Sequence, residues 1–288
     1  MNNVCGWIAL AGQTSQRPTL KGLQKADWLI IGGGITGLSA AHALARMLPQ
    51  QRIVLLDRQR AAQGASARNS GFVVSHELPG ADELLGRPGH SAYQLACGIG
   101  IAAGEEVRRR IDELGIECEF DAGGYHFAVH QGQHLQDSGA RVATLNAAGA
   151  QAQYLEGAAL QQRLGSGFYQ RAIHCAGGNA LLQPAKYVKG LLERLPERVE
   201  VFENSPVQDL QPLPGRGWRA VTGEGEIQAP QVLACVGAFL PRLGVRHSRT
   251  FPLELSASIT RPLQEDHWQR LLDEQGWGVL STCLLYTS

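Results

Sequence analysis

The chain has 288 residues, 44% of them hydrophobic, which is enough for about two globular domains with sizeable cores. Its 26 basic residues balance its 26 acidic residues, and this balance gives no electrostatic support for a nucleic-acid-binding protein. No stretch reaches the length of a membrane-spanning helix, so we expect no transmembrane segment.

The N-terminal residues 1–26 are mostly polar and predict an extended arm. They lack the basic start and the apolar core of a signal peptide. The six cysteines of the chain form no Cys-x-x-Cys pair, and none is spaced with a histidine as zinc ligands are. We therefore expect buried thiols in a reducing, cytoplasmic protein and no metal site.

Residues 27–57 have the pattern of a dinucleotide-binding βαβ unit. An apolar strand runs into Gly-x-Gly-x-x-Gly, which begins a helix, and a second apolar strand ends at Asp57. We expect Gly32 to form the tight turn, Gly34 to let the backbone approach a pyrophosphate, and Gly37 to let the helix pack on the strand. The helix N-terminus would face the phosphates. Asp57 would accept hydrogen bonds from the adenosine ribose, which disfavours NADP but fits both FAD and NAD.

The loop that follows, residues 58–90, has no helical or strand periodicity, and so long a loop after such a strand is typical of functional segments. Within it, residues 64–71 read Gly-Ala-Ser-Ala-Arg-Asn-Ser-Gly. Small residues allow close backbone approach, and the hydroxyl, amide and guanidinium groups can donate to a phosphate or a carboxylate. A short NAD half-site does not need this second segment, whereas the longer FAD does; the alternative is a solvated turn.

The remaining pattern predicts a helix over 91–114 that ends at Gly115, and a hairpin around Gly123-Gly124. The strand at 231–235 can return to the parallel sheet beside the first strand, which would bring Gly237 to the cofactor, or it can be an ordinary core strand. The predicted hairpin strands are 116–121 and 125–130; further helices are 134–148, 156–164 and 184–195, and further strands are 199–202, 207–210 and 218–222.

From this order we predict an α/β fold in which a Rossmann-like FAD-binding domain is interleaved with a mainly β substrate domain. The hairpin interrupts the dinucleotide unit before its later strands. The predicted ranges are 27–115 and 178–241 for the FAD-binding domain, and 116–177 and 242–282 for an incomplete substrate domain.

Three segments carry a resemblance to a known family: 31–41, 54–58 and 64–72. They resemble the D-amino-acid-oxidase-type family of FAD-dependent oxidoreductases, and within it the γ-glutamylputrescine oxidoreductase and glycine/sarcosine-oxidase-like branch. The arm at 7–26 and the segment 181–187, which contains Gln-Pro, are also similar to that branch.

The resemblance implies an extended FAD held by residues of the first segments and of two later ones. Gly32, Gly34 and Gly37 would face the pyrophosphate, Asp57 the ribose, and Arg58 the adenine side. The loop residues would approach the pyrophosphate, ribityl and flavin groups, Val207 would meet the adenine through its backbone, and Gly237 would provide a second close approach. These loop residues are Ser66, Arg68, Asn69, Ser70 and Gly71.

The resemblance further implies oxidation of the C–N bond of an amine or amino acid by hydride transfer to flavin N5, with O2, a quinone or another electron carrier as acceptor. The resemblance identifies no catalytic protein residue. His76, just past the flavin loop, could face the substrate, but a lone histidine in a polar Ser-His-Glu turn is more often solvated. The alternatives are a nicotinamide-dependent dehydrogenase and an inactive, truncated flavin-fold fragment.

The fragment alternative comes from the C-terminal end of the chain. The family closes its flavin site with a glycine-rich segment, and the chain stops before one. Its last residues, 283–288, back-translate to a transposase end sequence used in sequencing libraries. We interpret them as a non-native tail.

Overall fold

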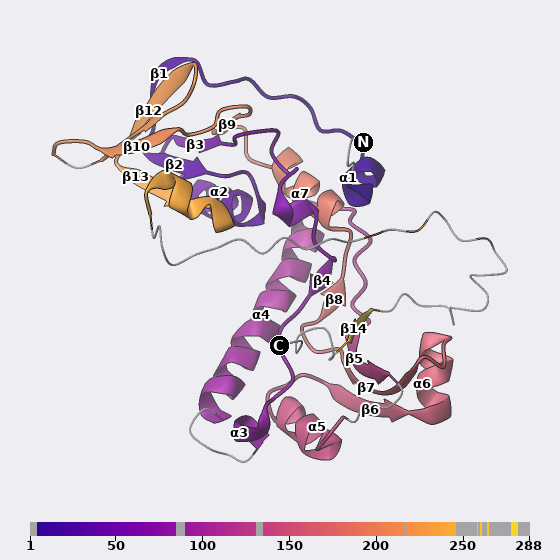
Figure 1. The fold of residues 1–288 in the computed structure, drawn as a ribbon. Coiled ribbons are helices and arrows are strands. Elements are labelled where there is room, and N and C mark those ends of the chain that lie inside the picture. The colour runs from indigo at the N-terminus through magenta and orange to yellow at the C-terminus, as the bar shows by residue number, and fades with distance from the viewer. Residues whose placement is uncertain are drawn as a thin grey trace. The chain divides into compact units, whose positions relative to one another are not determined.

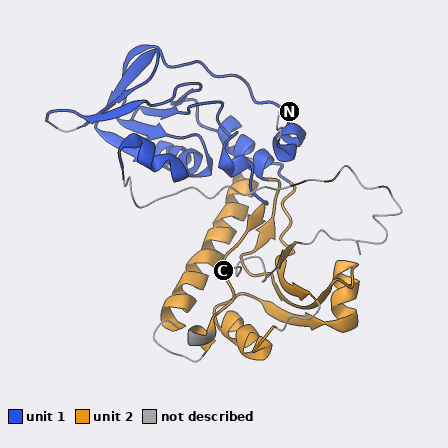
Figure 2. Ribbon diagram, viewed as in Figure 1, with its two compact units in different colours: residues 1–70, 116–118, 184–258 blue, residues 71–115, 119–183, 259–288 orange. Residues whose placement is uncertain are grey.

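The computed structural model describes residues 5–84, 90–130, 135–215, 217–245, 258, 260, 264 and 278–281. The chain divides into two compact units (Figure 2). Unit 1 is residues 1–70, 116–118 and 184–258, and unit 2 is residues 71–115, 119–183 and 259–288. The tail at 283–288 and most of 242–282, predicted as part of the substrate domain, lie outside the described residues.

Unit 1 contains a sheet of four parallel strands in the order β13-β2-β3-β9 (Figure 1). The strand β3 is buried along its whole length, as expected for an apolar strand with both faces covered. The pairing of β13 with β2 confirms that the chain returns to the first strand, one of the two alternatives open from the sequence. The strands are β2 (Trp28–Ile31), β3 (Ile53–Leu56), β9 (Val199–Phe202) and β13 (Gln231–Ala234).

Two helices of unit 1 contact each other beside this sheet, α2 (Ile35–Met47) and α7 (Pro184–Glu193). The α2 residues Leu38, Ala41 and Ala45 recur at helical spacing and are fully buried. Both helices follow the predicted pattern, and α7 begins at a proline, where the missing N–H costs nothing.

A second sheet of unit 1 has the order β1-β12-β11-β10 and packs its apolar face on the parallel sheet through a shared core that includes Leu20, Leu29, Leu56 and Ile227. Two expectations are corrected here. The N-terminal arm is not extended throughout, because residues Gly6–Ala11 form the helix α1, and the strand β12 of this sheet was not predicted. The strands are β1 (Gly22–Lys25), β10 (Asp209–Pro212), β11 (Trp218–Val221) and β12 (Gly225–Ala229).

Unit 2 is built on a sheet of order β14-β5-β7-β6, in which β7 pairs antiparallel with both β5 and β6. Its core includes Tyr125, Phe127, Leu145 and Ile173. The strands are β5 (Tyr125–His130), β6 (Ala152–Glu156), β7 (Tyr169–Cys175) and β14 (Val279–Ser281), with a short pair β4 (Phe72–Val73) and β8 (Ala180–Leu181); the helices are α3 (Ala81–Leu84), α4 (His90–Leu114), α5 (Ser138–Ala147) and α6 (Gly157–Leu164).

The predicted hairpin of 116–121 with 125–130 is wrong. The strand β5 pairs with β7 and β14, and the segment 116–121 forms an isolated bridge from Asp121 to Leu181. The glycine pair explains the misreading. Gly124 has a φ of 75°, and a Cβ there would lie 2.2 Å from the carbonyl oxygen of Cys175. The glycine thus serves close approach to β7 and not a reversal of the chain.

Residues 71–115 cluster with unit 2, although the sequence analysis groups them with the FAD-binding domain. The reason is the packing of α4. A Cβ at Gly100 would lie 1.7 Å from the carbonyl oxygen of Ser75, and one at Gly104 would lie 1.9 Å from that of Gly178. Backbone contact this close binds the helix to unit 2. The mixed α/β class is as predicted, and among the described residues no helix is long and apolar enough to cross a membrane.

Candidate functional site

The carboxyl ends of the four parallel strands meet at one edge of the sheet of unit 1. Ile31, Leu56 and Phe202 lie in register at this edge, and Ala234 pairs with Ile31. Ligands of open parallel sheets bind at such an edge. The residues that follow the strands are therefore the first candidates for a site.

The glycine-rich turn after β2 has the geometry that its sequence predicts. Gly32 has a φ of 110°, a region that L side chains rarely adopt, and its N–H donates to the carbonyl oxygen of Leu56 at 2.8 Å. A Cβ at Gly37 would lie 1.9 Å from the carbonyl oxygen of Gly32. The helix α2 can therefore pack on β2 only with glycine at this position.

The N-terminus of α2 is open to a ligand. Gly34 is the N-cap without a side-chain cap, and the first turn holds no acidic residue. Ser66, from the predicted second segment, accepts a hydrogen bond of 3.0 Å from Ile35 N–H through its Oγ. A Cβ at Gly34 would lie 2.8 Å from that oxygen. The structure thus brings the two glycine-rich segments together at a helix N-terminus, where backbone N–H groups and the helix dipole favour an anion.

Asp57 lies beside this turn. Its Oδ2 accepts a hydrogen bond of 2.8 Å from Gly33 N–H, and its Oδ1 accepts one of 2.9 Å from Gln59 N–H. Burial raises the pKa of the carboxyl group above its usual value, and the two backbone hydrogen bonds oppose that shift. The charge of Glu203 raises the pKa further.

Three more of the predicted residues also lie in unit 1, namely Arg58, Val207 and Gly237. The guanidinium of Arg58 lies 4.2 Å from the ring centroid of Phe239, in the 3-10 helix η2 (Gly237–Leu243) that Gly237 begins. Arg58 and Gly237 are therefore on neighbouring segments. Val207 is half-buried and packs on the core between the two sheets of unit 1.

The rest of the loop 64–71 makes local contacts. Arg68 Nε donates to Gln63 O at 2.8 Å, and Asn69 Nδ2 donates to Ser66 O at 2.8 Å. Ser70 is exposed and ends unit 1. Gly71, at the start of unit 2, has a φ of 80°, and its carbonyl oxygen accepts from Leu182 N–H at 2.9 Å.

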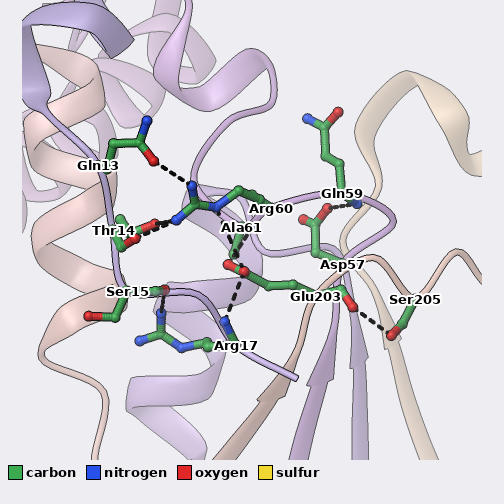
Figure 3. A network of polar contacts seen from close by, with 10 residues as sticks. All are labelled: Gln13, Thr14, Ser15, Arg17, Asp57, Gln59, Arg60, Ala61, Glu203 and Ser205. Atoms are coloured by element: carbon green, nitrogen blue, oxygen red, sulfur yellow. Dashed lines mark hydrogen bonds and ion pairs between the residues drawn. The ribbon is translucent and has the colours of Figure 1, made fainter. Parts of the chain in front are cut away.

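The sequence analysis missed Glu203 and Ser205, which follow β9 at the same edge as Asp57. The Glu203 side chain is fully buried, and its Oε1 accepts a hydrogen bond of 3.1 Å from Ala61 N–H (Figure 3). Ser205 N–H donates to the carbonyl oxygen of Asp57 at 2.8 Å. A signal was present, because Glu203 directly follows a predicted strand just as Asp57 does.

His76, the predicted catalytic candidate, is buried in unit 2 and is not in a solvated turn. Ser75 Oγ lies 2.7 Å from His76 Nδ1, and it is also within hydrogen-bonding distance of Asn179 Oδ1, at 2.8 Å, and of Gly177 O, at 3.2 Å. His76 Nε2 has no hydrogen-bond partner among the described residues. Burial lowers the pKa of His76 to about 4, so the ring is neutral near pH 7.

Two further histidines of unit 2 contact each other, the buried His126 on β5 and the half-buried His174 on β7. The rings of His126 and His174 are 4.7 Å apart, and burial lowers the pKa of both. Nowhere in the described part of the chain do three metal-ligating side chains gather, and the five cysteines described are free thiols.

Comparison with known families and sequences agrees with this geometry. Residues 27–282 match the model of the family described as FAD dependent oxidoreductase (DAO). The chain is 25% identical over 261 residues to the "Probable oxidoreductase OrdL" of Haemophilus influenzae, covering 88% of the chain and 59% of that protein. It is 26% identical over 267 residues to the γ-glutamylputrescine oxidoreductase of Escherichia coli, covering 90% and 61%. The chain thus spans about three fifths of the length of these relatives.

Solved structures with the same fold include two enzymes that act on amino acids. The glycine oxidase of Geobacillus kaustophilus superposes with a TM-score of 0.64 at 17% identity, covering 78% of this chain and 58% of that one. An L-amino acid deaminase of Proteus vulgaris superposes with a TM-score of 0.65 at 18% identity, covering 86% and 62%. At these identities the likeness concerns the fold alone.

Proposed function

The chain belongs to the FAD dependent oxidoreductase family, and from that premise we propose that it binds FAD at the carboxyl edge of the parallel sheet. We further propose that it takes part in oxidising the C–N bond of a small amine or amino acid. The observation that carries the proposal is the meeting of Gly34, Ser66 and Asp57 at the open N-terminus of α2.

The residues present fit the adenosine diphosphate half of FAD. The start of α2 offers backbone N–H groups with no acidic side chain to repel a pyrophosphate. Asp57 uses one lone pair on each oxygen for backbone N–H groups, which leaves others for ribose hydroxyl groups. Arg58 and Gly237 would line the same edge. In our proposal Arg68, Asn69, Ser70 and Gly71 turn from their local contacts toward the rest of the cofactor, and Val207 meets the adenine.

Bound FAD would supply the acceptor for a hydride from the carbon next to the substrate nitrogen. The protein would orient that carbon and keep the amine unprotonated, because a lone pair on nitrogen is needed to release the hydride. His76 is our candidate on the substrate side. It is neutral and lies beside Ser75, and its Nε2 could accept a hydrogen bond from the substrate amine and so orient it.

The substrate class follows from the relatives, whose names specify γ-glutamylputrescine, glycine and L-amino acids. We propose a small molecule with a primary or secondary amine, and O2 or a quinone-type carrier as the electron acceptor. A cytoplasmic location remains our proposal.

The test is flavin content. Purified protein should be yellow and should release FAD on denaturation, and it should oxidise γ-glutamylputrescine or glycine with reduction of O2 or of a dye. A colourless protein that binds NADH would support a nicotinamide-dependent dehydrogenase instead. A protein that binds FAD but is not reduced by any amine would support the inactive flavin-fold alternative.

A further inference from the structure

A buried carboxylate, that of Glu203, contacts both the turn that carries Asp57 and the N-terminal arm (Figure 3). The Oε1 atom of Glu203 accepts from Ala61 N–H in that turn at 3.1 Å. Its Oε2 atom accepts from Arg17 N–H in the arm at 3.2 Å. Each oxygen therefore binds one of two segments that are more than forty residues apart in the chain.

Further hydrogen bonds on both sides of Glu203 extend this link. The arm also binds the segment 203–205, which follows β9: Glu203 N–H donates to Pro18 O at 2.9 Å, and Leu20 N–H donates to Ser205 Oγ at 2.9 Å. The Asp57 turn binds the same segment, because Asn204 N–H donates to Gln59 O at 3.1 Å. The segment 203–205 thus lies between the arm and the turn.

Arg60 joins the two segments directly. Its guanidinium donates to Gln13 Oε1 at 2.9 Å and to Thr14 Oγ1 at 3.0 Å, and its Nε lies 3.9 Å from Glu203 Oε2. The Glu203 carboxylate is fully buried, and Arg60 is the cation beside it among the described residues. Burying a carboxylate is costly unless it is hydrogen-bonded and paired, so the arm and the turn are both needed to keep this charge inside.

We propose that Glu203 is a positioning residue that couples the seating of the N-terminal arm to the conformation of the Asp57 turn. The adenosine end of the FAD site would then form only when the arm is in place. This inference rests on the proposed function, since it assigns the Asp57 turn to the adenosine half of FAD.

The first test needs no cofactor. Glu203→Gln leaves one acceptor oxygen for two N–H groups and directs an NH2 group at one of them. In site-resolved hydrogen exchange of the chain without FAD, we expect protection of the Ala61 and Arg17 amides to fall together by about 10- to 100-fold. The matched control is Glu200→Gln on the same strand, whose carboxylate pairs with Arg52 at 2.6 Å; it should leave both amides unchanged. Loss of protection at only one amide, or at neither, would overturn the coupling.

The second test addresses the cofactor. Glu203→Gln should weaken FAD and ADP by the same factor, about 10-fold, because ADP carries the half that meets the turn. A loss for FAD with none for ADP would overturn the positioning role. If the unsubstituted chain binds neither ligand, the proposed function fails, while hydrogen exchange at Arg17 and Ala61 still decides the coupling. Should Glu203→Gln not fold, Arg60→Gln removes the Arg60 contacts with Gln13 and Thr14 and leaves the buried Glu203 carboxylate without its cation, and protection of the same two amides should fall together.

Discussion

Asp57 Oδ2 accepts a hydrogen bond of 2.8 Å from the N–H of Gly33. The carboxylate predicted to bind the ribose therefore also holds the glycine-rich turn. Burial raises its pKa, which means that ionised Asp57 is less stable in the folded chain than in water. A carboxylate kept at a cost to folding is typical of a ligand-binding residue.

Asp57→Asn should lower the affinity for FAD by about 10- to 100-fold, the equivalent of about 1.5–3 kcal/mol for a lost charge-assisted hydrogen bond. The amide has one acceptor oxygen, and its NH2 group would face the N–H of Gly33 or Gln59. Flavin fluorescence titration of the apoprotein measures the change. Asp27→Asn is the control, because that carboxylate binds Arg52 N–H before the start of β2. Equal affinities of the Asp57 variant and the unsubstituted chain would refute the assignment.

The parts of the site that could be predicted are those in which sequence neighbours determine the geometry. Gly32, Gly37 and Asp57 belong to one βαβ unit, and a fixed spacing places them. The contact of Glu203 with Arg17 joins residues 186 positions apart, so no local pattern reports it. The sequence does mark Glu203 as a carboxylate directly after a strand, but only the strand order places β9 beside β3.

The hairpin error has a similar origin. A Gly-Gly pair between two apolar runs predicts a reversal of the chain. At Gly124 the same residue type is required by the carbonyl oxygen of Cys175, in a strand that is distant in the sequence. Glycine is needed for a tight turn and for close backbone contact alike, and the sequence alone does not separate the two requirements.

Gly37→Ala should destabilise unit 1 by about 1–3 kcal/mol or more, as overpacking in a close contact does. Its new Cβ would lie 1.9 Å from Gly32 O, and the helix and the glycine-rich turn would have to separate. Urea unfolding measures the change. Gly64→Ala is the control, since no atom lies within 4 Å of a Cβ there. Equal unfolding midpoints for the two variants would show that α2 does not need this contact.

His76→Gln should reduce kcat/KM for the amine substrate by about 10-fold, the equivalent of a lost orienting hydrogen bond. The affinity for FAD should stay unchanged, because His76 belongs to unit 2 and the proposed adenosine site belongs to unit 1. Steady-state kinetics and flavin titration measure the two quantities. His90→Gln is the control, a histidine at the start of α4 whose Nδ1 binds Glu83 O. Unchanged kinetics in the His76 variant would remove this residue from the proposed reaction.

His126 should make the stability of unit 2 depend on pH. Its side chain is 1% exposed, and burial lowers its pKa to about 4, against about 6.5 in an unfolded chain. Between these values the unfolded chain binds more protons, so stability decreases as the pH falls from 6.5 toward 4. The contribution of this one group at pH 4.5 is on the order of 2 kcal/mol.

The measurement is urea unfolding at pH 7, 5.5 and 4.5 for the chain and for His126→Gln, whose side chain does not titrate. The variant will be less stable at pH 7, because it replaces a buried ring that binds Gly278 O at 3.2 Å. The informative quantity is therefore the slope: the variant should lose about 2 kcal/mol less than the unsubstituted chain between pH 7 and 4.5. His130→Gln, at the half-buried end of β5, should keep the original slope. If the stability of His126→Gln falls with pH as steeply as that of the unsubstituted chain, the acid sensitivity of unit 2 arises from other groups. His76 would then be the next residue to substitute.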